Sequence, residues 1–203
     1  MRTHRRTLFL LTTLVILATS TSWLQARAAS GDVAPIQWSR FRPGSPADGN
    51  AVRVRDILLN ANRYALTTWW KQKGFATQKD PYLSFGGGGE THIRPTASEA
   101  FALAVSVKTG AYDAGKAGVS LPVAKEYALR LVRSLARQHL ANTPGGWGDQ
   151  WQSALWASSA GTAGWLLWDD LSPADRESVR RMVEREANRF TAYNVPYYST
   201  REG

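Results

Sequence analysis

The stretch GGWGDQWQSALWASSAGTAGWLLW, residues 145–168, gathers aromatic side chains around a single carboxylate. It holds five of the nine tryptophans of the chain, and Asp149 is its only charged residue. An exposed indole stacks on the C–H face of a sugar ring, while carboxylate and amide groups bond sugar hydroxyls. We therefore interpret five neighbouring residues as candidates for contact with a saccharide: Trp147, Asp149, Gln150, Trp151 and Gln152.

These residue types also have simpler structural interpretations. Asp149 has the position of an N-cap or first-turn acid, which would bond the free backbone N–H groups of the next helix. Trp147 and Trp151 are as consistent with packing as with binding. The three later tryptophans of the stretch are expected to be core residues, namely Trp156, Trp165 and Trp168.

A second segment, GGGGETHIRP at residues 86–95, carries a carboxylate, an imidazole and a guanidinium. His92 can act as a general base near neutral pH, or be an ordinary surface imidazole. Arg94 can hold a carboxylate by a bidentate contact, or form a salt bridge where a helix begins. Glu90 is a further candidate for substrate binding. The glycines match neither GxxxxGK[ST] nor GxGxxG after a strand, so a nucleotide site is not indicated.

A third segment, NVPYYSTREG at residues 194–203, holds the remaining candidates. A tyrosine beside a cation can act as an acid or base, and the tyrosine pair here is close to Arg201. Tyrosine pairs also simply pack. The residues of interest are Asn194, Tyr197 and Tyr198.

The composition argues against several other kinds of site. The chain has no cysteine, so it has neither a disulfide nor a thiolate metal site. Of its three histidines, His4 lies in the leader and His139 is expected to interact with the dipole at the end of a helix. We therefore expect no metal ion and no cofactor. No basic tract with interleaved aromatics is present, so no nucleic-acid partner is expected.

Residues 1–29 have the pattern of a signal peptide. Arg2, Arg5 and Arg6 form a basic start, residues 8–24 are apolar but diluted by hydroxyls, and Ala-Arg-Ala at 26–28 is a cleavage signal. The hydroxyls weaken the alternative of a membrane anchor, so none is expected after cleavage. We expect a secreted or periplasmic protein, exported by the Sec route in preference to the twin-arginine route.

Cleavage would leave a mildly basic chain with one domain. The 25 basic residues would fall to 21 while the 16 acidic residues remain, so the net charge would fall from +9 to +5. That balance suits an acidic polymer. Residues 30–50 read as an extended lead-in, and 51–203 as the domain.

Apolar spacing and capping signals predict helices only, so the expected fold class is all-α. Thr96 followed by Glu99 is a capping box for the second helix, which should stop at Gly110. Pro122 suits the first turn of the third helix, and Ser172 with Pro173 suits the start of the fifth. The five predicted helices are 51–73, 94–109, 122–141, 151–171 and 172–191.

The distribution of charge predicts which helices are interior. Helices 94–109 and 151–171 are apolar nearly all round and should be inner, whereas the other three are charged and should be outer. Short connections make successive helices antiparallel. The connections 74–93, 142–151 and 192–203, which carry the candidate residues, should then share one end of the molecule.

Such helix pairs, with GGWGDQWQSALWA opening an inner helix, resemble the (α/α) toroid of secreted polysaccharide lyases, including the heparinase II/III-like and chondroitin/hyaluronate lyase groups. The resemblance covers about residues 50–203. It implies that Trp147, Trp151 and Gln152 line a cleft for the saccharide, and that Tyr198 or His92 removes the proton next to the uronate carboxylate. Asp149 and Gln150 stand where heparinase-like lyases often have Asn-His. Five helices cannot close a toroid of ten or more, so we expect an N-terminal part of a longer domain.

The leading interpretation is an exported lyase that cleaves a uronate-containing, acidic polysaccharide by β-elimination, with Arg94 neutralising the developing enolate. Its candidate catalytic residues are His92, Tyr198 and Asp149. One alternative is a toroidal glycoside hydrolase with Glu90 and Asp149 as paired carboxylates. Another is a non-catalytic, secreted sugar-binding helical protein.

Overall fold

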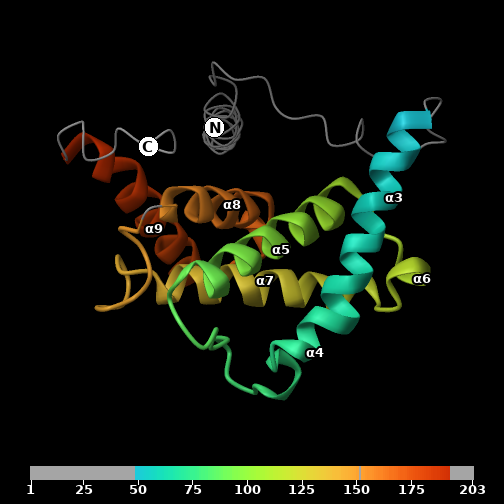
Figure 1. Ribbon diagram of the computed structural model, residues 1–203, viewed down its shortest axis with the longest axis horizontal. Helices are drawn as coiled ribbons and strands as arrows, with labels where there is room; N and C mark the ends of the chain where they lie inside the picture. Colours follow the sequence, from blue (N-terminus) through green and yellow to red (C-terminus); the bar gives the residue numbers. More distant parts are fainter. Residues whose placement is uncertain (1–48, 151, 193–203) are drawn as a thin grey trace, which may run out of the picture. The chain divides into compact units, whose positions relative to one another are not determined.

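The computed structural model describes residues 49–150 and 152–192. These residues form helices and loops without a strand, so the all-α class is confirmed (Figure 1). No helix among them is both long enough and apolar enough to cross a membrane. The expected signal peptide and nearly all of the lead-in lie outside the described residues, as do four candidates: Trp151, Asn194, Tyr197 and Tyr198.

The first described helix, α3 (Gly49–Tyr64), continues through a π-helical segment (Ala65–Trp69) into α4 (Trp70–Gln72). Helical backbone therefore covers nearly the same residues as the predicted 51–73. A 3₁₀ turn (Phe75–Thr77) follows, in which Phe75 packs edge-on against Trp69 and Trp70 at 5.3 and 5.2 Å between ring centroids.

The second long helix, α5 (Glu90–Thr109), begins earlier than the capping box predicted. Its N-cap is Gly89, and Thr96 lies inside the helix with its hydroxyl donating to the carbonyl of His92 at 2.6 Å. A threonine hydroxyl can bond the preceding turn of a helix, so the Thr-x-x-Glu spacing does not require a helix start. Gly110 ends α5 in the left-handed conformation, as predicted.

The helices after α5 agree better with those predicted from the sequence. A short helix, α6 (Ala114–Ala117), was not predicted, but α7 (Leu121–Gln138) has Pro122 in its first turn as expected. Helix α8 (Ser153–Leu166) is shorter than 151–171 and leads to a 3₁₀ turn (Trp168–Asp170). Helix α9 (Pro173–Ala192) starts where predicted, because the Ser172 hydroxyl accepts the N–H of Asp175 at 3.1 Å.

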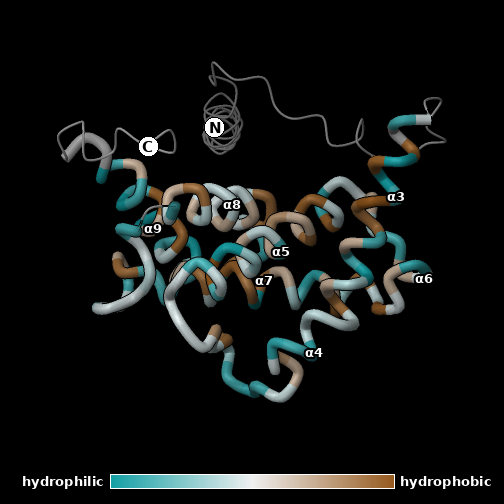
Figure 2. The backbone as a smooth tube through the Cα atoms, in the orientation of Figure 1, coloured by the Kyte–Doolittle hydropathy of each residue, from teal (hydrophilic) through white to brown (hydrophobic). Residues whose placement is uncertain are grey.

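Helices α5 and α8 pack against each other and against α7, while α9 covers α7 and α8 and α3 contacts α5 and α6 (Figure 1). The core between them contains mainly alanine and leucine from α5 and α7 with small residues of α8. Figure 2 shows hydrophilic residues along much of α9 and neutral or hydrophobic residues along α8.

Helix α8 is buried on one side only. Trp156 is 4% exposed, as expected for a core residue, but Trp165 is 54% and Trp168 37% exposed. The prediction that Trp165 and Trp168 are core residues is therefore wrong. The apolar residues of α8 are spread around the helix, and the described residues cover only the side that faces α5, α7 and α9.

The starts of α5 and α8 lie at the same end as the end of α7, as antiparallel alternation requires (Figure 1). Arg94 Nη1 of α5 lies 3.4 Å from Gln152 Oε1, and the Trp147 N–H donates to the carbonyl of Gln138 at 3.0 Å. The two polar connections before α5 and before α8 therefore meet in space.

Candidate functional site

Trp147 is a core residue. Its side chain is 1% exposed, its Nε1–H donates to the carbonyl of Leu135 at 2.9 Å, and its ring meets the His139 ring edge-on at 4.6 Å between centroids. No face of this indole is open to a sugar. The interpretation of Trp147 as a saccharide platform is therefore wrong, and the packing alternative holds.

Asp149 is held by an arginine of α9. Its Oδ2 accepts from Arg185 Nη2 at 2.6 Å, and its backbone has a φ of 54°. It is not the N-cap of α8, because Gln152 occupies that position. The preceding Gly148 has a φ of 129°, and a Cβ there would come within 2.6 Å of His139 Nε2, so only glycine fits.

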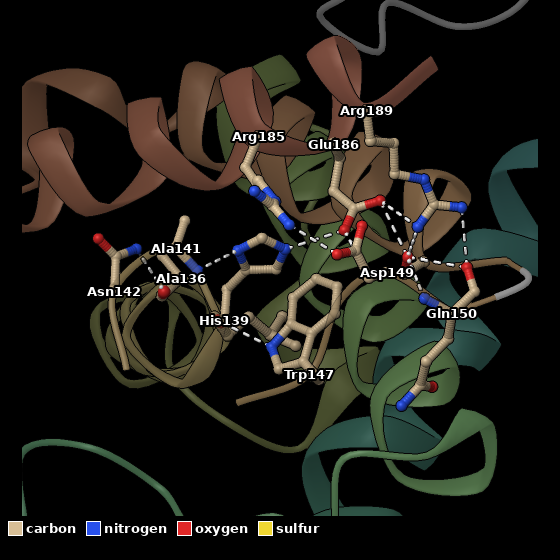
Figure 3. Close-up of polar contacts among 12 residues, drawn as sticks. Ala136, His139, Ala141, Asn142, Trp147, Asp149, Gln150, Arg185, Glu186 and Arg189 are labelled. Atoms are coloured by element: carbon tan, nitrogen blue, oxygen red, sulfur yellow. Dashed lines mark hydrogen bonds and ion pairs between the residues drawn. The ribbon is translucent and has the colours of Figure 1, made fainter. Parts of the chain in front are cut away.

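A buried carboxylate, Glu186 of α9, fixes the loop that contains Asp149 (Figure 3). Glu186 Oε1 accepts from His139 Nε2 and from the Asp149 N–H, each at 3.1 Å. Its Oε2 accepts from the Ser153 hydroxyl and from Arg189 Nη1, each at 2.9 Å. Burial alone would raise the pKa of Glu186, but the bonds from His139, Asp149 and Ser153 and the charge of Arg189 together hold it below its usual value.

The protonation of His139 follows from its two contacts. Its Nδ1 accepts the backbone N–H of Ala141 at 3.1 Å, so the ring proton sits on Nε2 and is donated to Glu186. His139 does follow the last turn of α7, as predicted. It is, however, a fully buried ring in a hydrogen-bonded cluster and does not act as a cation on the helix dipole.

Asp149 and Gln150 are thus held through their backbone by a structural clasp, which we define as His139, Ser153, Glu186 and Arg189. Arg189 Nη2 also donates to the carbonyl of Gln150 at 2.9 Å, and its Nη1 contacts the Ser153 hydroxyl. The clasp could not be predicted from the sequence, because Glu186 and Arg189 lie in a helix that is charged throughout. Their three-residue spacing was the only local signal.

A pocket of about 390 Å³ opens beside the clasp, between the first turns of α5 and α8. Its lining residues are Glu90, Gln150, Gln152 and Trp156. Arg94 stands at its edge, paired with Glu90 at 2.6 Å and in contact with Gln152. We call this the α5–α8 pocket. Its volume is within the range of small-ligand sites.

Trp156 is the polar group that the sequence interpretation missed here. The residue is 4% exposed, and its Nε1–H is buried without a hydrogen-bond partner among the described residues. A buried donor that makes no bond costs free energy, and Trp156 is also one of the residues that line the α5–α8 pocket. The sequence indicated only a core aromatic at this position.

His92 lies away from Arg94. Its Nδ1–H donates to the carbonyl of Phe85 at 2.8 Å, which leaves the lone pair on Nε2. A Cβ at Gly87 would come within 3.0 Å of that Nε2, so the glycine makes room for the ring. Residues two apart on a helix project about 200° from each other. His92 therefore faces the 85–87 loop, while Glu90 and Arg94 face α8.

Glu99, two turns beyond His92 on α5, is a second unexpected group. Burial raises the pKa of its carboxyl to about 7. Groups that titrate near neutral pH are frequent in functional sites. The capping-box interpretation had placed Glu99 in the first turn of the helix and did not predict this property. No three acidic or histidine side chains among the described residues are grouped so as to hold a metal ion.

Comparison with known proteins supplies no relative. A scan of protein-family models, a search of curated proteins and a search of solved structures each gave no match to this chain. The lyase-like toroid therefore stays a prediction from the sequence. The geometry of the α5–α8 pocket has to support a function by itself.

Proposed function

We propose that this protein binds an acidic, uronate-containing saccharide in the α5–α8 pocket and acts as an exported polysaccharide lyase. The observation that supports this most is the composition of one pocket, which is lined by Gln152 and Trp156 and has Arg94 in contact with Gln152 at its edge; among the described residues the Trp156 Nε1–H has no hydrogen-bond partner. A cation, an amide and an indole donor are suited to a carboxylate with neighbouring hydroxyls.

Arg94 can exchange its present partner, Glu90, for a carboxylate of the substrate. Its pair with Glu90 is more than half exposed on both sides. Such surface pairs contribute about 0–1 kcal/mol, so a substrate carboxylate can replace Glu90 at small cost. Glu90 would then be released to accept hydrogen bonds from sugar hydroxyls. Gln150 and Gln152 offer both amide donors and acceptors to the same ring.

β-Elimination needs a base and charge neutralisation on the same sugar. The base removes the proton next to the carboxylate, the electrons form a carbon–carbon double bond, and the glycosidic oxygen leaves with a proton. Arg94 would stabilise the charge that develops on the carboxylate. His92 has its lone pair on Nε2 but projects from the other side of α5. Tyr198 is therefore the base that we propose to test first.

The hydrolase alternative has less support. Glu90 lines the α5–α8 pocket, whereas Asp149 is not among its lining residues and is bound to Arg185 of α9 at 2.6 Å. A pair of catalytic carboxylates must instead reach the glycosidic bond from two sides. Binding without turnover is favoured by one observation, the separation of His92 from Arg94, and is retained as the second candidate.

The test of the reaction type uses the full chain and a panel of polyuronates. A lyase produces an unsaturated sugar that absorbs in the ultraviolet, whereas a hydrolase produces reducing ends without that absorbance. We expect ultraviolet-absorbing product from at least one polyuronate, and its loss in Tyr198→Phe. Reducing ends alone would support the hydrolase, and binding without either product would support the sugar-binding protein.

A further inference from the structure

A second polar pocket lies at the other end of α5, beside the connection that the sequence predicted to carry little chemistry. It has a volume of about 540 Å³, and its lining includes Arg55 and Leu59 of α3 with Tyr112, Asp113 and Lys116 of the 111–116 segment. Helix α5 has 20 residues and separates it from the α5–α8 pocket by about 30 Å.

Among the described residues, no hydrogen-bond acceptor contacts the guanidinium Nε of Arg55. Among the described residues, no carboxylate lies within 4.0 Å of its guanidinium, and its Nε is buried without a hydrogen-bond partner. An arginine stays charged at every physiological pH. Leaving a donor of such a group buried and unbonded costs free energy that an anion in the pocket would recover. The neighbouring Arg53, by contrast, is exposed to water.

Lys116 supplies a second positive charge to the same pocket. Its Nζ lies 3.1 Å from Asp56 Oδ1, in a pair about half exposed on each side. An exposed pair of this kind is weak, so Lys116 can also contact a ligand. The pocket therefore presents two cations from different elements, α3 and α6.

Asp113 and Tyr112 add acceptors for hydroxyl groups. Asp113 Oδ1 caps α6 by accepting the N–H of Lys116 at 3.0 Å, and its Oδ2 makes no hydrogen bond among the described residues. Tyr112 donates its hydroxyl to the carbonyl of Val119 at 2.6 Å, so its phenolic oxygen can only accept a further bond. Burial and the charge of Asp113 both raise the pKa of Tyr112, which keeps it protonated.

We propose that this pocket binds a small hydroxy acid, such as a sugar acid. Its carboxylate would bond Arg55 and Lys116, and a hydroxyl would donate to Asp113. The carboxylate of Asp113 disfavours an anion without hydroxyls, because such a ligand only repels it. The proposal does not depend on the lyase function, since the two pockets share no lining residue.

Calorimetric titration of the full chain with glucuronate tests this proposal, with glucose as the neutral match and acetate as the carboxylate without hydroxyls. We expect glucuronate to bind more tightly than either. Arg55→Gln should weaken glucuronate binding at least about tenfold, as loss of a charged hydrogen-bond partner does. Arg53→Gln, on the exposed side of α3, should leave this binding unchanged. Each titration is also made in an Arg94→Gln background, which removes the proposed uronate contact of the α5–α8 pocket, so that the signal that remains belongs to the pocket at Arg55.

Asp113→Asn separates recognition of hydroxyls from simple charge attraction. Asparagine caps a helix as well as aspartate, so α6 is preserved. We expect weaker glucuronate binding and stronger acetate binding in this variant. Arg55→Lys, which keeps the charge, gives a further measurement if circular dichroism shows that Arg55→Gln is unfolded, and should also weaken binding. No glucuronate binding by the wild type, or equal binding by the Arg55 variants, would overturn the proposal.

Discussion

Glu186 Oε1 of α9 lies 3.1 Å from Nε2 of His139, the residue that follows the last turn of α7, and both side chains are almost fully buried. This contact fixes the distance between two helices and the loop that lies between them. The same carboxylate binds Arg189 and the backbone N–H of Asp149. The clasp therefore positions the start of α8, on which the α5–α8 pocket depends.

Glu186→Gln should destabilise the protein strongly. The change keeps the shape of the side chain but removes the buried negative charge that Arg189 contacts at 2.9 Å, and breaking a buried ion pair costs about 3–5 kcal/mol. Denaturation by urea measures the loss. Glu184→Gln is the matched control, because Glu184 is on the same helix and about half exposed, and it should change stability by less than about 0.5 kcal/mol. Equal effects of the two substitutions would show that the clasp contributes nothing.

Glu99→Gln should change the dependence of stability on pH. The folded pKa of Glu99, about 7, is above the unfolded value of 4.5, so the contribution of Glu99 to stability is highest below pH 4.5 and falls as the pH rises to about 7. Glutamine cannot ionise and avoids that loss. We expect the variant to be more stable than the wild type by about 2 kcal/mol near pH 8, and equal to it near pH 4.

Urea denaturation at those two pH values measures the effect of Glu99. Glu126→Gln, at an exposed position of α7, should show no such difference between the two. A gain at Glu99 that is the same at both pH values would contradict burial as its cause.

Trp147→Phe should lower stability without a direct effect on saccharide binding. Phenylalanine removes the N–H that bonds the carbonyl of Leu135 and leaves a small cavity, at a cost of about 2 kcal/mol. Thermal unfolding gives the change in stability. A variant that folds normally but no longer binds acidic saccharides would restore the interpretation of Trp147 as a sugar contact.

Trp156→Phe should weaken saccharide binding and change stability only slightly. The Nε1–H of Trp156 has no acceptor among the described residues, so its removal sacrifices no bond within the protein. We expect stability within about 1 kcal/mol of the wild type, and saccharide binding weakened about fivefold by loss of one neutral hydrogen bond. Together with Trp147→Phe, this pair of variants distinguishes a structural indole from a ligand donor. Unchanged binding in Trp156→Phe would remove this residue from the site.

The fold class and most helices could be predicted because they depend on local signals. Pro122 and the Ser172-Pro173 pair mark helix starts by their own backbone chemistry, and Gly110 marks a stop by its left-handed conformation. The meeting of the two polar connections followed from alternation of direction alone. The start of α5 was misjudged because Thr96 has two local hydrogen-bonding options with the same sequence spacing.

The site was harder to predict because burial is a tertiary property. Trp147 was a candidate sugar contact and Trp165 an expected core residue, yet Trp147 is buried and Trp165 is exposed. Glu186 could not be distinguished from its charged neighbours on α9 until the clasp was seen. Likewise, the sequence showed Trp156 as a core aromatic but not that its N–H lacks a partner.

Recognition of a uronate carboxylate by Arg94 is the central claim. Calorimetric titration of the full chain with an acidic oligosaccharide tests it, using Arg94→Gln and, as the matched control, Arg181→Gln at an exposed position of α9. We predict that Arg94→Gln weakens binding at least about tenfold and that Arg181→Gln does not change it. Binding of equal strength by the wild type and Arg94→Gln would contradict the account.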